Sequence, residues 1–343
     1  MNDHGRTATQ RNGWIWCALA AVLFGAATPA TKLVVDHIGS VTLAGLLYLG
    51  AAAAVAPFAL RQPRRAAAAR QRSLLLLAVG LGGGVAPVLL VLALHCAPAG
   101  TVSLFLNLEL VATAVVARVF LQEHIGRRAG MGITIVVLGG AILAGASGGG
   151  ATVGMLLVAA TCVCWGIDNA ITASLDSYTP AQITMAKGVI AGTVNLCLGL
   201  ALDGVPQLSY VLAALAIGAA GYGVSIAMWI TGARLVGAAR GQTVFALAPF
   251  IGALLAWPVN GDRLTPTTLA AFVVCLAGVV LVASARHAHT HTHQPQEHAH
   301  PFDPDDPHHR SGTIEVVSGV QHRHLVMQHE HEHLPDIHHR HVH

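Results

Sequence analysis

The sequence predicts an all-α membrane protein: ten transmembrane helices in two inverted five-helix repeats, followed by a disordered tail. Three observations predict this fold: a shortage of charge, ten apolar stretches of span length, and an internal repeat. Hydrophobic residues make up 54% of the chain and charged residues only 10%, whereas a soluble domain has about 25% charged residues. Such a chain cannot cover itself with polar surface, so we expect lipid to cover it.

Each predicted span is an apolar stretch of about 20 residues, the length that crosses a bilayer. The first follows Arg6 and Arg11 and resembles a signal peptide, but it is too long for one, so we expect an uncleaved helix. The predicted spans are 14–35, 41–60, 74–95, 99–121, 129–146, 152–174, 181–202, 208–230, 238–258 and 266–284.

The internal repeat rests on two stretches 139 positions apart. Residues 108–125 read LELVATAVVARVFLQEHI and residues 247–264 read LAPFIGALLAWPVNGDRL, which places Glu123 over Asp262. Upstream, Phe24-Gly25 is echoed by Trp165-Gly166. The order of these features predicts two repeats, 14–146 and 152–284, joined by a Gly-rich linker.

The copies differ at one place in this register. Glu109 lies opposite Ala248, and Leu110 lies opposite Pro249. The scaffold would therefore be symmetric while one side alone carries a charge.

Positive charge orients the predicted spans. With residues 1–13 in the cytoplasm, the inside segments hold eleven arginines, and the outside connections hold Arg263 and Lys32. This bias follows the positive-inside rule and places both termini in the cytoplasm. Since five spans per repeat is an odd number, the second repeat must be inverted, and such repeats hold a solute near the bilayer midplane. The inside arginines are Arg6, Arg11, Arg61, Arg64, Arg65, Arg70, Arg72, Arg127, Arg128, Arg234 and Arg286.

Composition and motifs argue against several function classes. All six cysteines lie within or beside apolar runs, which favours buried thiols over a disulfide framework. No nucleophile triad or cofactor fingerprint is present, and Gly80–Gly84 lies inside a span, where glycines favour helix packing over phosphate binding. The net charge of +3 describes no single region and gives no argument for nucleic-acid binding. We therefore expect neither an enzyme nor a nucleic-acid binder.

One family shares this order of features. The stretch 94–144, LHCAPAGTVSLFLNLELVATAVVARVFLQEHIGRRAGMGITIVVLGGAILA, closely resembles the second part of an EamA repeat of the drug/metabolite transporter superfamily, and so does 231–283. Both have an apolar helix, an acidic turn and a Gly-rich last helix. Phe24-Gly25 with Lys32 resembles the first-helix pattern of the family. The resemblance implies a ten-helix carrier with cytoplasmic termini.

The chain departs from the family pattern in each repeat. Leu110 replaces the expected proline of the fourth helix in the first repeat, and Ala173 replaces the expected lysine in the second. Substrates of the family range from amino acids to nucleotide sugars and cations, so the resemblance selects no substrate.

Glu109 is the first candidate for transport chemistry because it lies near the middle of the fourth span. A charged side chain there costs about 2.5–3.5 kcal/mol, so it faces a cavity or a partner. Two interpretations stay open: a proton-coupling carboxylate or cation ligand, and a hydrogen-bonded acid that only ties helices together.

The sixth span offers Asp168 and Asn169, with Cys164 one turn earlier on the face of Asp168. A thiol and a carboxylate together suit a borderline divalent metal ion, although small cysteines also pack as apolar residues. Lys187, in the seventh span, either pairs with Asp168 or extends to the cytoplasmic surface. Lys32 either extends outward or takes part in function.

Histidine dominates the last segment, 286–343, which holds 17 of the 21 histidines. Low hydrophobicity with repeated polar residues predicts disorder. Imidazole binds Zn, Ni and Cu, so the alternating pattern predicts a tail that wraps around metal ions. The alternatives are a tolerated low-complexity tail and a pH-sensitive one. The predicted metal ligands are His287, His289, His291, His293, His298, His300, His329, His331, His333, His338, His339, His341 and His343.

These observations lead to one functional hypothesis and two alternatives. We expect a secondary carrier of the bacterial inner membrane that exports a small solute by alternating access, with Ni, Co or Zn favoured by the tail. The first alternative is an exporter of amino acids or small metabolites whose tail only buffers metal. The second is a membrane protein that stores or senses metal without transport. The expected partners are the bilayer and the solute, with a homodimer left open, and no cofactor is required.

Overall fold

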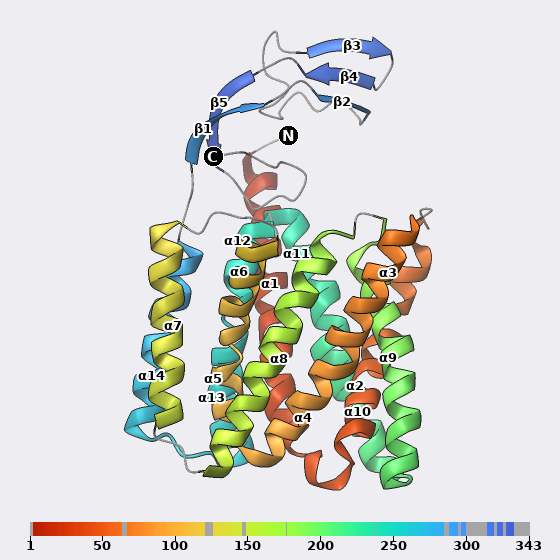
Figure 1. Cartoon of the computed structure of the whole chain (residues 1–343), viewed down its shortest axis with the longest axis vertical. Helices are drawn as coiled ribbons and strands as arrows, with labels where there is room; N and C mark the ends of the chain where they lie inside the picture. Colours follow the sequence, from red (N-terminus) through yellow and green to blue (C-terminus); the bar gives the residue numbers. More distant parts are fainter. Residues whose placement is uncertain are drawn as a thin grey trace. The chain divides into compact units, whose positions relative to one another are not determined.

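The computed structural model describes residues 3–63, 67–120, 126–145, 149–175, 177–236 and 238–284, and five short stretches of the tail: 288–293, 296–299, 314–318, 321–324 and 327–332. Two compact units divide the chain at Ala283 and Ser284. In the described part of the first unit, ten helical segments are long and apolar enough to cross a membrane (Figure 1). This confirms the predicted spans, whose ends differ from the observed ones by at most five residues.

Several spans contain more than one helical element. The elements of the first repeat are α1 (Asp3–Lys32), η1 (Val35–His37), α2 (Ser40–Arg61), α3 (Ala69–Ala78), η2 (Val79–Val85), α4 (Ala86–Cys96), α5 (Ala99–Phe105), α6 (Leu108–Phe120) and α7 (Arg127–Gly145). Those of the second are α8 (Gly149–Ala173), α9 (Pro180–Asp203), α10 (Leu208–Gly218), η3 (Ala219–Val224), α11 (Ser225–Val236), α12 (Ala238–Phe245), α13 (Ala248–Asn260) and α14 (Pro266–Ala283).

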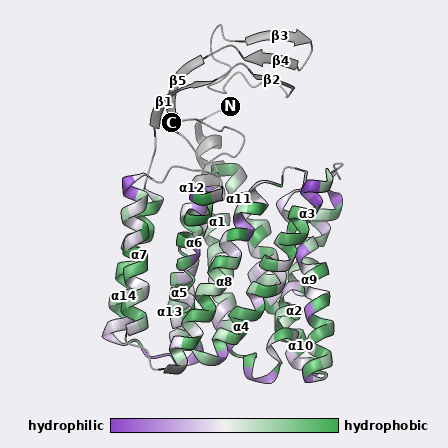
Figure 2. Ribbon diagram, viewed as in Figure 1, coloured by the Kyte–Doolittle hydropathy of each residue, from purple (hydrophilic) through white to green (hydrophobic). Residues whose placement is uncertain are grey.

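Large apolar side chains lie on both the inside and the outside of the bundle. Leu43 and Leu94 are fully buried, whereas Leu156 and Leu202 are 67% and 65% exposed. Figure 2 shows hydrophilic residues mainly at the two ends of the bundle and apolar ones along its length. An outer face of this composition is stable only against lipid.

Close packing of α7 against α14 shows the relation between the repeats. A Cβ atom on Gly132 would lie 2.7 Å from the Gly278 carbonyl oxygen, and one on Gly278 would lie 2.8 Å from the Gly132 carbonyl oxygen. About one turn further along both helices, the Cys275 thiol lies 3.9 Å from the Val136 carbonyl oxygen. Since Val136 and Cys275 are 139 positions apart, each repeat presents the same face of its last helix to the other.

The first helices of the repeats also occupy equivalent places. Gly25 of α1 packs on α13, where a Cβ atom would lie 3.2 Å from the Gly252 nitrogen. Gly166 of α8 packs on α6, where a Cβ atom would lie 3.0 Å from the Ala112 Cβ. This confirms the echo between Phe24-Gly25 and Trp165-Gly166. Small residues at both crossings let the backbones approach closely.

The fourth span of each repeat is broken at an equivalent place. Both helices break at two-residue turns, after Phe105 and after Phe245, and resume at Leu108 and Ala248. These starting points are 140 positions apart, whereas the packing contacts keep the predicted spacing of 139, since Gly25 meets Ile251 and Gly252 where Gly166 meets Ala112 and Thr113.

Glu109 is the second residue of α6 and Pro249 is the second residue of α13. Each residue therefore lies in the first turn after the break, and in the predicted register Glu109 stays opposite Ala248.

The third and eighth spans each contain a π-helical segment, η2 and η3, which the sequence analysis did not predict. They lie at the same position in the two repeats: Gly82 and Gly84 are 139 positions before Gly221 and Gly223. A π-helical turn widens the backbone and leaves carbonyl groups without their usual partners, and such turns occur often at functional sites. Each repeat therefore has a π-helical segment at which its third span can bend, here called a joint.

The interrupting prolines have different positions. Pro87 lies in the first turn of α4, directly after η2, and Pro249 lies in the first turn of α13, directly after the break. A first-turn proline is tolerated because its missing N–H needs no partner there. Pro29 lies inside α1, which continues to Lys32.

In the tail, the described stretches pair as short strands, whereas the sequence predicts disorder for 286–343. Alternating Thr and His in 288–293, and Ile and Val in 314–318, suit extended backbone. The other tail residues lie outside the described residues. The strands are β1 (Ala288–His293) paired with β5 (Met327–Glu332), and β2 (Gln296–Ala299), β4 (Gln321–His324) and β3 (Ile314–Ser318) in that order, all antiparallel.

Candidate functional site

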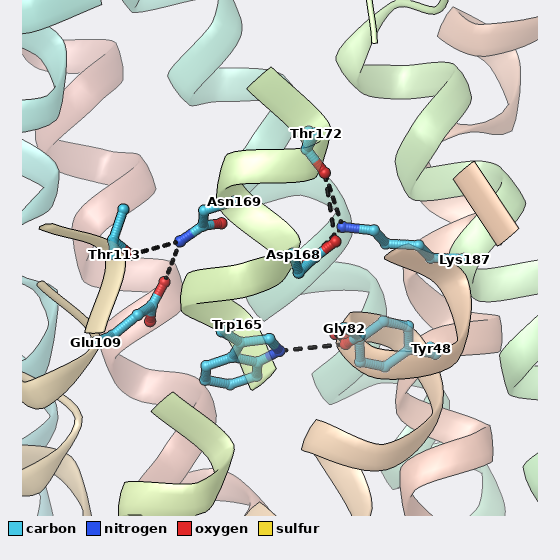
Figure 3. Close-up of polar contacts among 9 residues, drawn as sticks. All are labelled: Tyr48, Gly82, Glu109, Thr113, Trp165, Asp168, Asn169, Thr172 and Lys187. Atoms are coloured by element: carbon cyan, nitrogen blue, oxygen red, sulfur yellow. Dashed lines mark hydrogen bonds and ion pairs between the residues drawn. The ribbon is translucent and has the colours of Figure 1, made fainter. Parts of the chain in front are cut away.

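Glu109 lies directly after the break in the fourth span and is partly buried. Asn169 of α8 donates a hydrogen bond from Nδ2 to Glu109 Oε1 over 2.8 Å, and the same nitrogen lies 3.3 Å from the Thr113 hydroxyl (Figure 3). Both neighbours are uncharged. The carboxyl group therefore has hydrogen-bonding partners but no positive charge bonded to it.

Asp168 has the opposite surroundings. The Lys187 ammonium of α9 lies 2.5 Å from Asp168 Oδ2, and the two side chains are 14% and 7% exposed, respectively. The Thr172 hydroxyl donates to Asp168 Oδ1 over 3.3 Å and lies 3.5 Å from the Lys187 nitrogen. Of the two interpretations of Lys187, the structure supports the ion pair with Asp168 over extension to the surface.

The two carboxylates face different neighbours. In Figure 3, Glu109 lies on one side of α8, towards α6, whereas Asp168 lies on the other, towards α9. Cys164 is half-buried, and the Asp168 carboxylate is already bound to Lys187. Among the described residues, no three His, Cys, Asp or Glu side chains come close enough to hold a metal ion. The metal site expected from Cys164 and Asp168 therefore has no third ligand of these types among the described residues.

Lys32 lies away from this cluster. It is the last residue of α1 and donates a hydrogen bond to the Leu94 carbonyl in the last turn of α4. Lysine at such a place satisfies a helix-end carbonyl. His95, the next residue, pairs at 3.4 Å with Asp36 of η1. These residues hold one end of the bundle together and bind nothing at its centre.

Side-chain donors surround η2, and the sequence did not predict them. The Gly82 carbonyl accepts hydrogen bonds from the Tyr48 hydroxyl at 2.7 Å and the Trp165 indole at 3.1 Å (Figure 3). The Gly84 carbonyl accepts one from Asn195 at 3.1 Å. These side chains partner carbonyls that the π-helical turn frees. Sequence could have indicated them only through the glycines shared by 80–85 and 219–224.

An aromatic array, here Trp229, Phe245, Phe24, Tyr222 and Tyr48, was also missed. Successive ring centroids lie 6.3, 5.1, 5.6 and 6.0 Å apart, distances at which aromatic rings interact. The rings come from both repeats, and the array ends at Tyr48, which binds η2. The Trp229 indole N–H is buried and has no partner among the described residues. Only 5% of the chain is aromatic, so this concentration is unusual for it.

The acidic turns of the repeat have a structural role where the structure describes them. Asp262 Oδ2 accepts a hydrogen bond of 2.6 Å from the Gly100 amide, in the first turn of α5. A carboxylate there stabilises the start of a helix. Its predicted counterpart, Glu123, lies outside the described residues.

The predicted metal ligands of the tail are only partly covered by the structure. The backbones of His289, His291, His293, His298, His329 and His331 lie in described strands, and pairing of β1 with β5 places His289 opposite His331 and His291 opposite His329. The remaining ones, His287, His300, His333, His338, His339, His341 and His343, lie outside the described residues.

Comparison with known proteins gives one family and one fold. The model of the EamA-like transporter family matches residues 11–145 and 152–284, one match for each repeat. A crystal structure of a protein with 18% identity covers 81% of this chain and 98% of its own, with a TM-score of 0.56; this supports the fold alone. No curated protein matches the chain in sequence. The two matches cover nearly all of the ten-span unit, and the chain therefore belongs to the EamA-like transporter family.

Proposed function

We propose that this transporter is a secondary carrier that exports a small organic solute across the bacterial inner membrane by alternating access. Glu109 is the group that binds the solute or the proton coupled to it. Family membership supports transport by a ten-span bundle; the solute, the coupling and the direction are the proposal.

The observation that carries this proposal is the contrast between the two carboxylates. Asp168 has Lys187 as a bonded counter-ion, whereas Glu109 has the neutral Asn169 as its bonded partner, and Asn169 in turn bonds Thr113. An acid in a span is costly unless it is partnered, and in the predicted register the second repeat has the uncharged Ala248 opposite Glu109. A carboxyl group of this kind is free to exchange a proton for a cationic group.

The surroundings favour an organic solute over a bare metal ion. A metal ion needs several ligands at once, and the described residues of the bundle offer no set of three. The aromatic array and the unpartnered Trp229 N–H instead provide apolar faces and one donor. Aromatic faces attract ammonium groups. A small molecule with an ammonium group and an apolar body, such as an amino acid, suits these groups.

Arginine placement supports the proposed orientation. Arg61 ends α2, Arg70 and Arg72 begin α3, and Arg127 and Arg128 begin α7. These helix ends lie at the same end of the bundle in Figure 1. By the positive-inside rule, we propose that this end of the bundle is cytoplasmic, as are both termini.

Flux into proteoliposomes tests the proposal. Wild type and Glu109→Gln are compared on an amino-acid panel and on Ni, Co and Zn, under a proton gradient and under a potential. Asp262→Asn is the matched control, because it neutralises an acid in a connection instead of a span. We expect amino-acid flux in wild type and the control and none with Glu109→Gln. Flux that survives in Glu109→Gln would exclude the role given to this residue.

A divalent metal is the second candidate solute, and the tail favours it. Backbone pairing of β1 with β5 brings two His-rich strands side by side, which raises the local concentration of imidazole. In this case the tail gathers cytosolic metal for the bundle. A chain cut at Arg286 would then lose metal flux at low metal concentration, whereas amino-acid flux would be unaffected.

The alternative from another functional class is a membrane protein that stores or senses metal without transporting it. It predicts metal bound to the tail and no flux of any solute in the same proteoliposomes. Flux of any member of the panel would exclude it.

A further inference from the structure

The π-helical segment η2 lies directly on the Asp168–Lys187 ion pair. A Cβ atom on Gly82 would overlap the Asp168 carboxylate, and one on Gly83 would lie 3.1 Å from the Lys187 Cβ. Glycines are therefore needed here because no side chain fits between the segment and the ion pair. Gly82 contacts α8 twice, since its carbonyl also accepts the Trp165 indole N–H. Asn195 of α9 holds the Gly84 carbonyl in the same way.

The matching segment of the second repeat has an apolar setting. A Cβ atom on Gly221 of η3 would lie 2.6 Å from the Ala27 Cβ. Ala27 is 141 positions before Asp168, the same spacing that relates Phe24 to Trp165. Within the described residues, no side chain donates a hydrogen bond to a carbonyl of η3. The two π-helical segments thus have the same backbone conformation but differ in the side chains that contact them.

This difference shows that the fold does not require the ion pair. The second repeat builds the same π-helical turn against Ala27. The helix α2 packs on η3 as α9 packs on η2, and it carries no charged residue before Arg61. A buried ion pair contributes little net stability, because desolvation of the two charges offsets their attraction. Its presence in only one repeat therefore points to a role in the working cycle.

We propose that η2 is a latched joint, meaning a π-helical segment whose bending is restrained by neighbouring side chains. The restraining residues are Asp168, Lys187, Trp165 and Asn195, which hold η2 to α8 and α9. The segment η3 lacks these contacts and bends more readily. The four side chains are positioning residues, since they act through the backbone of η2 and not on the solute. Asn169 binds Glu109 and adjoins Asp168 in α8. A solute that displaces Asn169 from Glu109 therefore shifts the helix that carries one half of the latch. The idea rests on the proposed alternating access, but its test requires no transport.

Hydrogen–deuterium exchange of the full chain in nanodiscs tests the latch in wild type first. Protection factors of amides in 79–86 are compared with those in 219–225, which serve as the control within the same molecule. We expect at least about tenfold higher protection in 79–86, equal to about 1.4 kcal/mol. Equal protection, or higher protection in 219–225, would overturn the assignment.

Variants then separate the latch from general stability. Lys187→Met should lower protection in 79–86 by about tenfold and leave protection in 219–225 unchanged. Trp165→Phe should have the same effect, because phenylalanine is the residue at the equivalent position of the first repeat, Phe24. Lys32→Met removes a lysine far from η2 and should change neither segment. The double variant Asp168→Asn/Lys187→Met leaves no buried charge unpaired. Its protection in 79–86 stays low if the ion pair is the latch, and wild-type protection in the double variant would refute the proposal.

Transport results are independent of these outcomes. If Glu109→Gln leaves flux intact while the exchange pattern holds, the role of Glu109 fails and the latch stands. If flux depends on Glu109 and the two segments exchange alike, the latch fails and the proposed carrier stands.

Discussion

Replacing Lys187 by Met tests the energetics of the buried ion pair. The change removes the ammonium group 2.5 Å from Asp168 Oδ2 but keeps a chain of similar length and volume. The Asp168 side chain is 7% exposed, so water cannot take the place of the lost charge. Breaking a buried pair in this way costs about 3–5 kcal/mol, and Thr172, a neutral donor, recovers only about 1 kcal/mol of it.

The double variant Asp168→Asn/Lys187→Met should cost far less than either single change. With no charge left, the desolvation cost of both groups disappears together with their attraction, so we expect a net change within about 1 kcal/mol of wild type. The interaction term from the cycle is then about 3 kcal/mol or more, at the upper end for residues in contact.

Unfolding of the protein in mixed micelles by increasing fractions of a denaturing detergent gives these free energies. Wild type, the two single variants and the double variant form one cycle, and Lys32→Met is the control for a lysine that binds only a helix-end carbonyl. The reasoning is refuted if Lys187→Met costs less than about 1 kcal/mol or if the two single costs add in the double variant.

Three further predictions follow from the contacts described above. Glu109→Gln should keep the hydrogen bond from Asn169 and the unfolding free energy within about 1 kcal/mol, while solute flux is lost; equal losses of flux and stability would contradict this. Asp262→Ala should lower the unfolding free energy by about 1–2 kcal/mol because the start of α5 loses its acceptor, whereas Arg263→Ala should not. Gly278→Ala should cost about 1–3 kcal/mol by forcing α14 from α7, whereas Gly130→Ala, with open space around it, should be neutral in the same assay.

The spans were predictable because lipid imposes a simple rule on composition. Ten apolar stretches of the right length, separated by charged or Gly- and Pro-rich connections, leave little freedom in where helices begin and end. The equivalence of Phe24-Gly25 and Trp165-Gly166 was also readable, since a helix crossing needs glycine at one position. Glu109 stood out because acids are rare in spans.

The contacts of the site were less accessible to sequence reasoning. Whether Lys187 extends to the surface or binds Asp168 depends on how α9 faces α8, which the spacing along either helix does not determine. The joints were missed because Gly80–Gly84 suits helix packing as well as a π-helical turn. Donors to a carbonyl come from other helices, so no local pattern reveals them.

The short connection between α8 and α9 bears on how the chain enters the bilayer. α8 ends at Ala173 and α9 begins at Pro180, so the acid and the base belong to one helical hairpin. Inserted singly, each charge would oppose partitioning by about 2.5–3.5 kcal/mol. Inserted together, they can neutralise each other before the later spans arrive, which makes α8 and α9 one insertion unit during biosynthesis. Glycosylation mapping of the nascent chain with and without Lys187 would show whether α8 then fails to integrate.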